Sequence, residues 1–356
     1  MDIKNISSIY KIHETRISSL ALFGGFIFDI LTLRRADTFF ENFWIIFYLS
    51  LATTIILWLS IKRSGKEGGR LSFWLFSILQ FSFGGLLSAF LILYFRSAAL
   101  SVSWPFLLLL LITFLANERL KSRYERLTYQ ISFLFLVIFL FLIFFVPVLT
   151  KTVGPIIFLV SGLLSLVIIR IFIFVLSRIN KDNLSLLMKN LRLSILSIFV
   201  VLNVFYFTNV IPPIPLSLKQ GGVYQSVDRE VNGDYVLKRE KRGFRDYFQL
   251  YPEISVLSGQ SVYAYTAIFS PAKFNIKVVH DWQFLNEDTG KWQRVSRVEL
   301  PIFGGRERGY RTYSFVNVSD GRWRVNVLTE DGQVIGRIKF DVRVVGTPPE
   351  LIQEVY

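Results

Sequence analysis

The chain has 356 residues, of which 52% are hydrophobic, and a formal net charge of +14 at neutral pH. It contains no cysteine, which excludes disulfide bonds, thiol nucleophiles and thiolate metal sites. The hydrophobic residues gather in long runs before residue 212, which argues against a chain of two or three soluble domains.

Seven long apolar runs fill this first part. At about 1.5 Å per residue, each predicts a helix able to cross a hydrocarbon core of about 30 Å. A large helical globule is the less favoured alternative, because a buried helix of a soluble protein rarely continues so far without a charge. The first run lacks the cleavage site of a signal peptide. The sequence therefore predicts an all-α transmembrane bundle in residues 1–211, with spans at Ile17–Leu33, Phe43–Ile61, Leu71–Phe95, Ala98–Leu115, Tyr129–Leu149, Val153–Leu176 and Leu191–Ile211.

Lysine and arginine are unequally shared between the two sets of loops. The N-terminal segment and alternate loops carry 15 of them, whereas the opposite loops carry only Arg34, Arg35, Arg96 and Lys151. Because cytoplasmic loops are enriched in Lys and Arg, this asymmetry predicts a cytoplasmic N-terminus and an extracytoplasmic C-terminal domain.

The positive charge belongs mostly to the membrane part. Residues 1–216 carry 20 basic and 9 acidic side chains, whereas residues 217–356 carry 20 and 17. Loop charges that face anionic lipid head groups explain most of the excess, so the lipid bilayer is the first expected partner. We expect no nucleic-acid partner, because the C-terminal domain is only weakly basic.

Several polar residues lie within or at the ends of the predicted spans, where an unpaired charge is costly. Asp29 and Arg96 lie near the outer ends of the first and third spans and are predicted to form an ion pair. Gln80 and Arg170 lie deeper, at comparable depths, and Asn117 is near them. Structural bonding within the bundle is the favoured interpretation, and a substrate or ion path is the alternative. The candidates are Asp29, Gln80, Arg96, Glu118 and Arg170.

The sequence changes character at VIPPIPLSLKQGG, where three prolines end the last span. Proline cannot continue a helix and favours an extended spacer, so residues 212–222 are predicted to be a linker. Short alternating runs rich in Val, Tyr, Phe and Trp follow, separated by Gly, Asp and Asn. They predict an extracytoplasmic, all-β, immunoglobulin-like antiparallel sandwich over residues 223–356. The runs are QSVYAYTAIF, FNIKVVHDWQF, KWQRVSRVEL, YRTYSFVNV, RWRVNVLT and QVIGRIKFDVRVV.

The clearest hairpin is predicted at VLTEDGQVIG, because an Asp-Gly pair suits a two-residue type I′ turn. Placing residues 331–332 in the turn pairs Trp323 with Phe340 and Val325 with Ile338 on one apolar face. Register and burial then agree, which supports the assignment.

The opposite face of this hairpin is basic. Arg324 is predicted to stand directly opposite Lys339, a like-charge pair that is locally unfavourable and hints at an external anion. Asp341 opposite Arg322 offers partial compensation, so an ordinary solvated face is the other interpretation. The predicted basic residues are Arg322, Arg324, Arg337, Lys339 and Arg343.

A second arginine cluster lies in PIFGGRERGYRTYS, between two predicted strands. One interpretation is a glycine-containing turn whose arginines are solvated or paired with nearby glutamates. The other is an anion site, in which backbone amides at Gly304 and Gly305 and the Arg311 side chain contact a carboxylate or phosphate. The candidate side chains are Arg306, Arg308 and Arg311.

Several segments resemble the bacterial domain of unknown function numbered 2914, namely VHDWQF, KWQRV, GGRERGYRTYS, GRWRVNVLTEDGQVIG and KFDV. GGFIFDILTLRRAD, QFSFGGLLSAFLILYFRSA and FLANERL are similar to the membrane portion found with that domain. The resemblance implies a multi-pass protein of the bacterial cytoplasmic membrane, and it implies no activity.

Motifs for catalysis are absent from the sequence. HETRI has Ile17 where a zinc protease needs its second histidine, and SGKEGGR lacks the spacing of a phosphate-binding loop. His13 and His280 are predicted on opposite sides of the membrane, so neither is expected to be a base. We expect no metal or cofactor.

Two function classes follow. The favoured one is a binding protein whose outer sandwich recognises an envelope polymer, a lipid head group or a partner protein. The alternative is a membrane-embedded enzyme or carrier for a lipid-linked substrate, with the β domain as an accessory.

Overall fold

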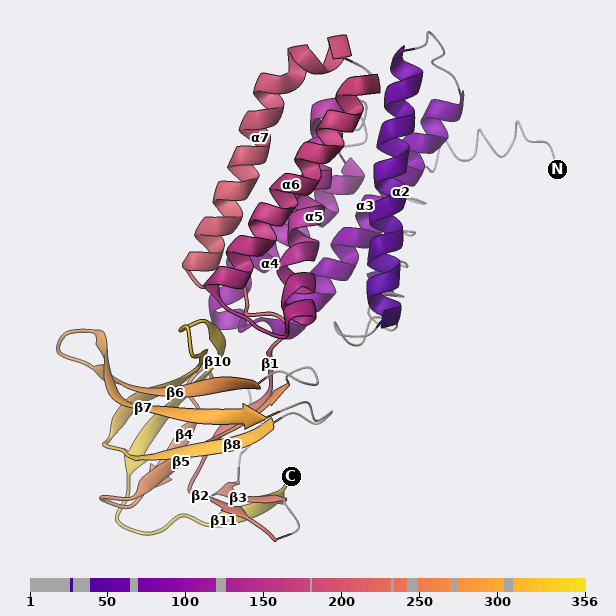
Figure 1. Ribbon diagram of the computed structural model, residues 1–356. Coiled ribbons are helices and arrows are strands. Elements are labelled where there is room, and N and C mark those ends of the chain that lie inside the picture. Colours follow the sequence, from indigo (N-terminus) through magenta and orange to yellow (C-terminus); the bar gives the residue numbers. More distant parts are fainter. Residues whose placement is uncertain are drawn as a thin grey trace. The chain divides into compact units, whose positions relative to one another are not determined.

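The computed structural model describes residues 26–27, 39–64, 70–119, 126–179, 181–231, 234–241, 249–269, 275–303 and 310–356 (Figure 1). The chain divides into two compact units. The helical unit lies within residues 1–211. The β unit comprises Pro212–Tyr356 together with the short segments Ser97–Ser103 and Lys151–Gly154.

Six helices in the described part of the helical unit are long and apolar enough to cross a membrane. They confirm six of the seven predicted runs, while most of the run Ile17–Leu33 lies outside the described residues. The helices extend beyond the predicted runs at one end or at both. They are α2 (Phe39–Ser64), α3 (Arg70–Ser97), α4 (Leu100–Arg119), α5 (Leu127–Thr150), α6 (Pro155–Ile179) and α7 (Lys181–Phe207).

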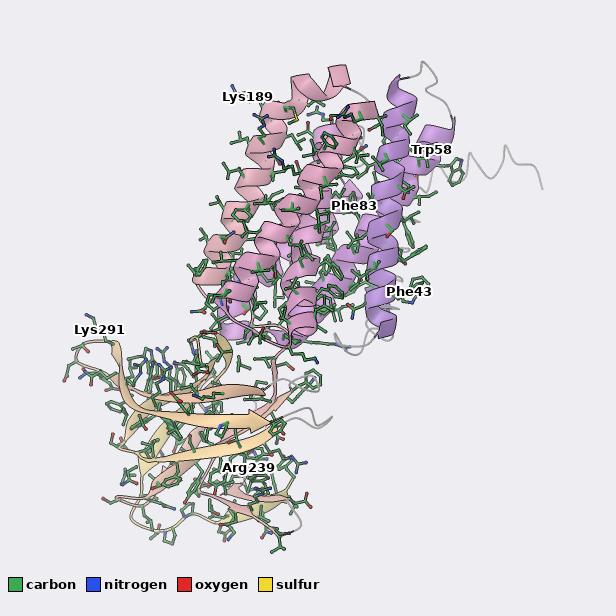
Figure 2. All side chains as sticks on the ribbon, in the orientation of Figure 1. Phe43, Trp58, Phe83, Lys189, Arg239 and Lys291 are labelled. Atoms are coloured by element: carbon green, nitrogen blue, oxygen red, sulfur yellow. The ribbon has the colours of Figure 1, made fainter. Side chains whose placement is uncertain are left out.

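Helix α5 forms the core of the helical unit, since most of its side chains are buried and it contacts α2, α6 and α7. Gly162 of α6 permits close packing there, because a Cβ atom at this position would lie 3.1 Å from the rings of Phe139 and Phe199. Phe83 of α3 is fully buried, whereas Phe43 and Trp58 of α2 are exposed (Figure 2). The outer surface of the helices is therefore largely apolar.

The β unit contains three sheets in its described residues. A five-stranded sheet has the order β4-β10-β9-β6-β7, a three-stranded sheet the order β1-β5-β8, and a small third sheet the order β11-β3-β2. The strands are β1 (Ser217–Tyr224), β2 (Ser226–Arg229), β3 (Tyr235–Glu240), β4 (Glu253–Val256), β5 (Ser261–Phe269), β6 (Asn275–Asn286), β7 (Lys291–Phe303), β8 (Tyr310–Asn317), β9 (Gly321–Thr329), β10 (Val334–Val344) and β11 (Leu351–Val355).

The main hydrophobic core lies between the five-stranded sheet and the β1-β5-β8 sheet. Alternating residues of each strand point inward, and Trp282, Val325 and Phe340 meet Ala264 and Ile268 there. The alternating pattern predicted a β-sandwich, and the β-rich C-terminal region is confirmed.

The third sheet was not predicted. It covers part of the other face of the β1-β5-β8 sheet through a second core that includes Tyr224, Tyr235 and Tyr265. The unit therefore has three layers, where the sequence predicted two (Figure 1). Strand β1 begins inside the predicted linker 212–222, and β4 runs parallel to β10, so the sheet is mixed and not purely antiparallel.

The β9–β10 hairpin has the predicted register through a different turn. Thr329 N donates to Gln333 O at 2.9 Å and Gly332 N to Thr329 O at 3.0 Å, so three residues connect the strands, and Gly332 has a φ of 84°. A bulge between Val334 and Gly336 then shifts the pairing back by one residue. The predicted two-residue turn was wrong, yet Trp323 still pairs with Phe340 and Val325 with Ile338.

Candidate functional site

The outer face of the five-stranded sheet carries a group of cationic side chains, called here the basic face. Along β9 and β10 they are in phase, because the alternate residues of those two strands fill the sandwich core, and Arg294 of β7 stands opposite Gln283 of β6. Figure 2 shows nitrogen-bearing side chains gathered near the β6–β7 hairpin that Lys291 marks. The basic face consists of Arg294, Arg322, Arg324, Arg337, Lys339 and Arg343.

A buried carboxylate lies at the centre of this face. Asp281 of β6 is 1% exposed. Its Oδ1 accepts from Arg294 Nε at 2.5 Å, and its Oδ2 accepts from Gln283 Nε2 at 2.5 Å and from Asn326 Nδ2 at 3.4 Å. Every donor comes from β6 or a neighbouring strand, so the charge is compensated within the sheet.

Two further arginines are tied to Asp281 through its amide partners. Arg324 Nε donates to Gln283 Oε1 at 2.7 Å, and Arg337 Nε donates to Asn326 Oδ1 at 2.6 Å. Each amide thus donates to the carboxylate and accepts from a guanidinium. The network fixes the direction of both guanidinium groups before any ligand binds.

Aromatic rings support the cations of the basic face. The Arg324 guanidinium carbon lies 4.2 Å from the ring centroid of Trp292. The Arg322 guanidinium carbon and Lys339 Nζ lie 5.6 Å and 5.4 Å from the ring centroid of Tyr251. Such placements are favourable because the face of an aromatic ring attracts a cation.

Burial lowers the pKa of Arg324 below its usual value, and the charge of Arg337 lowers it further, while Tyr251 and Asp281 act in the opposite direction. Burial likewise lowers the pKa of Arg337. Both guanidinium groups nevertheless stay charged at neutral pH, since arginine does not deprotonate in proteins. Partial burial of like charges leaves a positive potential on this face.

The edges of the basic face are partly neutralised. Arg343 Nε lies 3.0 Å from Glu253 Oε1, and Asp341 stands opposite Arg322 as predicted. Arg324 also stands opposite Lys339 as predicted. Three carboxylates therefore accompany six cations among the described residues, and the face keeps an excess of positive charge.

Arg311 is the one arginine of the glycine-arginine cluster within the described residues, since Arg306 and Arg308 lie outside them. It belongs to β8, in the other main sheet, and its Nη1 lies 3.6 Å from Asp234 Oδ1. Arg311 is therefore separate from the basic face.

His280 is fully buried between the two main sheets. Its Nδ1 lies 2.8 Å from Ser314 Oγ and its Nε2 lies 3.0 Å from Thr266 Oγ1. Trp282 Nε1 donates to the same Ser314 oxygen at 2.9 Å, so this hydroxyl joins His280 to Trp282. Burial lowers the pKa of His280 to about 4, which makes the neutral ring a structural link.

The polar residues of the helices separate into bonded and exposed positions. Gln80 Nε2 donates to Asn117 O and Asn117 Nδ2 donates to Gln80 O, both at 3.2 Å, which joins α3 to α4. Arg96 is half-buried and Arg170 is exposed on α6. Asp29 and the side chain of Glu118 lie outside the described part of the chain, so the Asp29–Arg96 pair stays a prediction.

Sequence reasoning missed the residues that organise the basic face, namely Asp281, Gln283, Asn326, Tyr251 and Trp292. The alternation in HDWQF was a usable signal for two of them, because it places Asp281 and Gln283 opposite the buried Trp282. Nothing local to the sequence connects Tyr251 to Arg322.

Comparison with protein families gives one match. A family model described as "Protein of unknown function (DUF2914)" matches residues 275–342. The matched segment contains most of the basic face. It runs from the start of β6 nearly to the end of β10, which confirms the resemblance for this segment alone. No curated protein gives a significant match.

Two solved structures show weak similarity. An immunoglobulin-like protein from Pseudomonas aeruginosa is 15% identical and covers 34% of this chain and 96% of its own, with a TM-score of 0.19. The Pseudomonas fluorescens alkylpurine DNA glycosylase, bound to DNA with an abasic site analogue, is 10% identical and covers 87% and 100%, with a TM-score of 0.22. Neither TM-score supports a shared fold or function.

Proposed function

We propose that this protein is a membrane-anchored binding protein of the bacterial envelope, whose β unit binds an anionic envelope component through the basic face. Phosphate or carboxylate groups, on a polymer or on a lipid head group, have the chemistry that guanidinium groups bind best. The observation that carries the proposal is the excess of cations, held in fixed directions by Asp281 and by two aromatic rings.

The proposal includes seven spans and an extracytoplasmic β unit. Six described helices have the length and apolarity of spans, and exposed Ile156, Leu163 and Phe174 on α6 suit a lipid environment better than water. The apolar run Ile17–Leu33 supplies the seventh span. An odd number of spans, combined with the charge asymmetry of the loops, then supports a β unit outside the cytoplasm.

Fixed guanidinium groups favour binding because their side-chain entropy is lost on folding and not on association. Arg324 and Arg337 are the fixed members, and Arg322 and Lys339 are nearer to solvent on Tyr251. An anion placed over the basic face would contact both the fixed guanidinium groups and the cations that rest on Tyr251. Binding of this type weakens as salt screens the charges.

The test uses the full chain in nanodiscs of neutral lipid, titrated with a glycerol phosphate polymer or with short-chain phosphatidylglycerol. The two probes distinguish a polymer from a lipid head group as the source of phosphate. The Arg322→Gln/Lys339→Gln variant removes two cations that do not bond to the Asp281 network. We expect the affinity of this variant for at least one probe to fall about tenfold. We also expect its affinity to depend less steeply on salt concentration.

The matched control removes two exposed cations elsewhere, in Lys241→Gln/Arg229→Gln. Affinity unchanged in the first variant, or lowered equally in both, contradicts the role of the basic face. If a chain that lacks residues 217–356 restores the phenotype of cells that lack the whole protein, the alternative of a membrane-embedded enzyme or carrier is favoured.

A further inference from the structure

A groove of about 540 Å³ opens on the outer side of the β1-β5-β8 sheet, where the third sheet covers this sheet only in part. Its volume lies within the range of about 300–1,000 Å³ that is typical of small-molecule sites. Residues from β1, β5, β8 and β11, the β2–β3 connection and the position after β11 line it, and they include three charged side chains. They are Lys219, Gln220, Asp234, Ala267, Arg311, Val355 and Tyr356.

The groove contains two cations and one carboxylate. Arg311 Nη1 lies 3.6 Å from Asp234 Oδ1, a contact that occupies only part of the guanidinium, which has five N–H donors. Tyr235 Oη donates to Arg311 O at 3.3 Å and thereby attaches β8 to the third sheet. Lys219 Nζ lies 5.2 Å from the ring centroid of Phe269. The positions of both cations are therefore set by the fold.

An aromatic row follows Arg311 along β8, and its member Tyr313 also packs on Tyr235 of the third sheet. Arg311, Tyr313 and Phe315 alternate along β8 and so share one face of the sheet. The Tyr263 ring of β5 lies 6.1 Å from that of Tyr313 and 5.3 Å from that of Phe315, measured between centroids. Phe315 is 57% exposed. A ligand that extends along β8 from Arg311 would therefore meet this row, defined as Tyr263, Tyr313 and Phe315.

We propose that the groove and the aromatic row together bind an acidic saccharide, a segment of a glycan that carries carboxylate groups. A sugar ring has an apolar C–H face that packs on aromatic rings, and its hydroxyl groups donate to carboxylates and amides such as those of Asp234 and Gln220. A sugar carboxylate is matched by Arg311 and Lys219. The aromatic row thus suits the C–H face of the sugar, Asp234 and Gln220 suit its hydroxyl groups, and Arg311 and Lys219 suit its carboxylate.

Other ligand classes fit these residues less well. An acyl chain needs a continuous apolar groove, whereas Lys219, Asp234 and Arg311 place charged groups along this one. A polymer with a phosphate on every unit would place negative charge against Asp234. An acidic saccharide avoids both problems, because its hydroxyl groups can lie at Asp234 while its carboxylate lies at Arg311.

This site is distinct from the basic face. The groove and the row lie on the outer side of the β1-β5-β8 sheet, and the basic face lies on the outer side of the five-stranded sheet, with the sandwich core between them. The inference therefore does not depend on the proposed function of the basic face.

The experiment is isothermal titration calorimetry of the full chain in neutral nanodiscs with a hexuronate tetrasaccharide. Maltotetraose, a neutral tetrasaccharide, and acetate, a simple carboxylate, are the comparison ligands. We expect the hexuronate to bind at least about tenfold more tightly than either, because only it engages both the cations and the rings. Phe315→Ala should weaken its binding about three- to tenfold, and Arg311→Gln about tenfold or more.

Lys241→Gln, which removes an exposed cation just beyond the end of β3 that is farthest from Asp234, is the matched control and should leave hexuronate affinity unchanged. Thermal melting of each variant checks the fold, and Lys219→Gln replaces Arg311→Gln if the latter lowers the melting temperature. The inference is overturned if the hexuronate gives no heat of binding at millimolar concentration. It is also overturned if acetate binds equally well, if folded Phe315→Ala and Arg311→Gln or Lys219→Gln variants bind unchanged, or if Lys241→Gln weakens binding as much as they do.

Discussion

Arg324 and Lys339 stand directly opposite each other on β9 and β10, yet their charged groups rest on different aromatic rings, those of Trp292 and Tyr251. The like-charge pair is thus accommodated without a shared counter-ion. Arg324 has a second partner in Gln283, whereas Lys339 contacts the ring of Tyr251. The two cations therefore differ in what they contribute to stability.

This difference leads to the first prediction. Arg324→Gln should lower the free energy of unfolding by about 1–2 kcal/mol, because Gln283 Oε1 loses its charged donor. Lys339→Gln should leave it unchanged or slightly higher, since a repulsive neighbour is removed. Denaturant titration of the full chain in neutral detergent, followed by tryptophan fluorescence, measures both. Equal losses in the two variants would contradict the distinction.

A second prediction concerns the ion pair of Asp281 and Arg294, in which the carboxylate is buried and the arginine side chain is 56% exposed. Asp281→Asn should cost about 1–3 kcal/mol, because it weakens bonds to Arg294, Gln283 and Asn326 together. Arg294→Gln should cost less, since solvent reaches that side of the pair. Adding Arg294→Gln to Asp281→Asn should then have little further effect. Strictly additive losses would show that the pair is not coupled.

A third prediction is a pH dependence that arises from His280. Its pKa in the folded chain is about 4, below the ordinary value of about 6.5, so protons bind the unfolded state preferentially. Stability from this residue is complete above pH 6.5 and is lost as pH falls from about 6.5 to about 4, by up to about 3 kcal/mol. His280→Gln should flatten this part of the stability profile. A profile that is the same in both proteins would rule out His280 as its source.

A fourth prediction concerns the reciprocal bonds between Gln80 and Asn117. Each side chain donates to the other residue's backbone oxygen, so removing one side chain leaves the second bond intact. Gln80→Leu and Asn117→Leu should each cost about 0.6 kcal/mol within a bundle, and the double variant should cost about the sum. Thermal melting in detergent tests this. Loss of the whole effect in either single variant would indicate a direct bond between the two side chains instead.

A fifth prediction addresses membrane topology. Because the chain has no cysteine, single cysteines can be introduced and probed with an impermeant thiol reagent. The loop charges predict that Ser64→Cys and Lys181→Cys react only after the membrane is broken, whereas Thr289→Cys in the β unit reacts in intact cells. The reverse pattern would overturn the proposed orientation.

Local patterns in the sequence determined the elements of this protein. Continuous apolar runs predicted α2 to α7, and alternation predicted β5 to β10, because helix length and strand periodicity depend on neighbouring residues. The register of β9 and β10 was also predictable, since a short hairpin restricts which residues can pair. Five of the six cations of the basic face followed from that register, and Arg294 of β7 did not.

Only the tertiary structure decided which distant residues meet. Strand β11 pairs with β3 across more than a hundred residues, and Tyr251 lies beside Arg322 and Lys339, without any local signal for either contact. The same holds for Arg311, which the sequence grouped with Arg306 and Arg308 but which pairs with Asp234. Such contacts depend on how the sheets stack, because strand periodicity specifies which face a side chain occupies but not which layer covers that face.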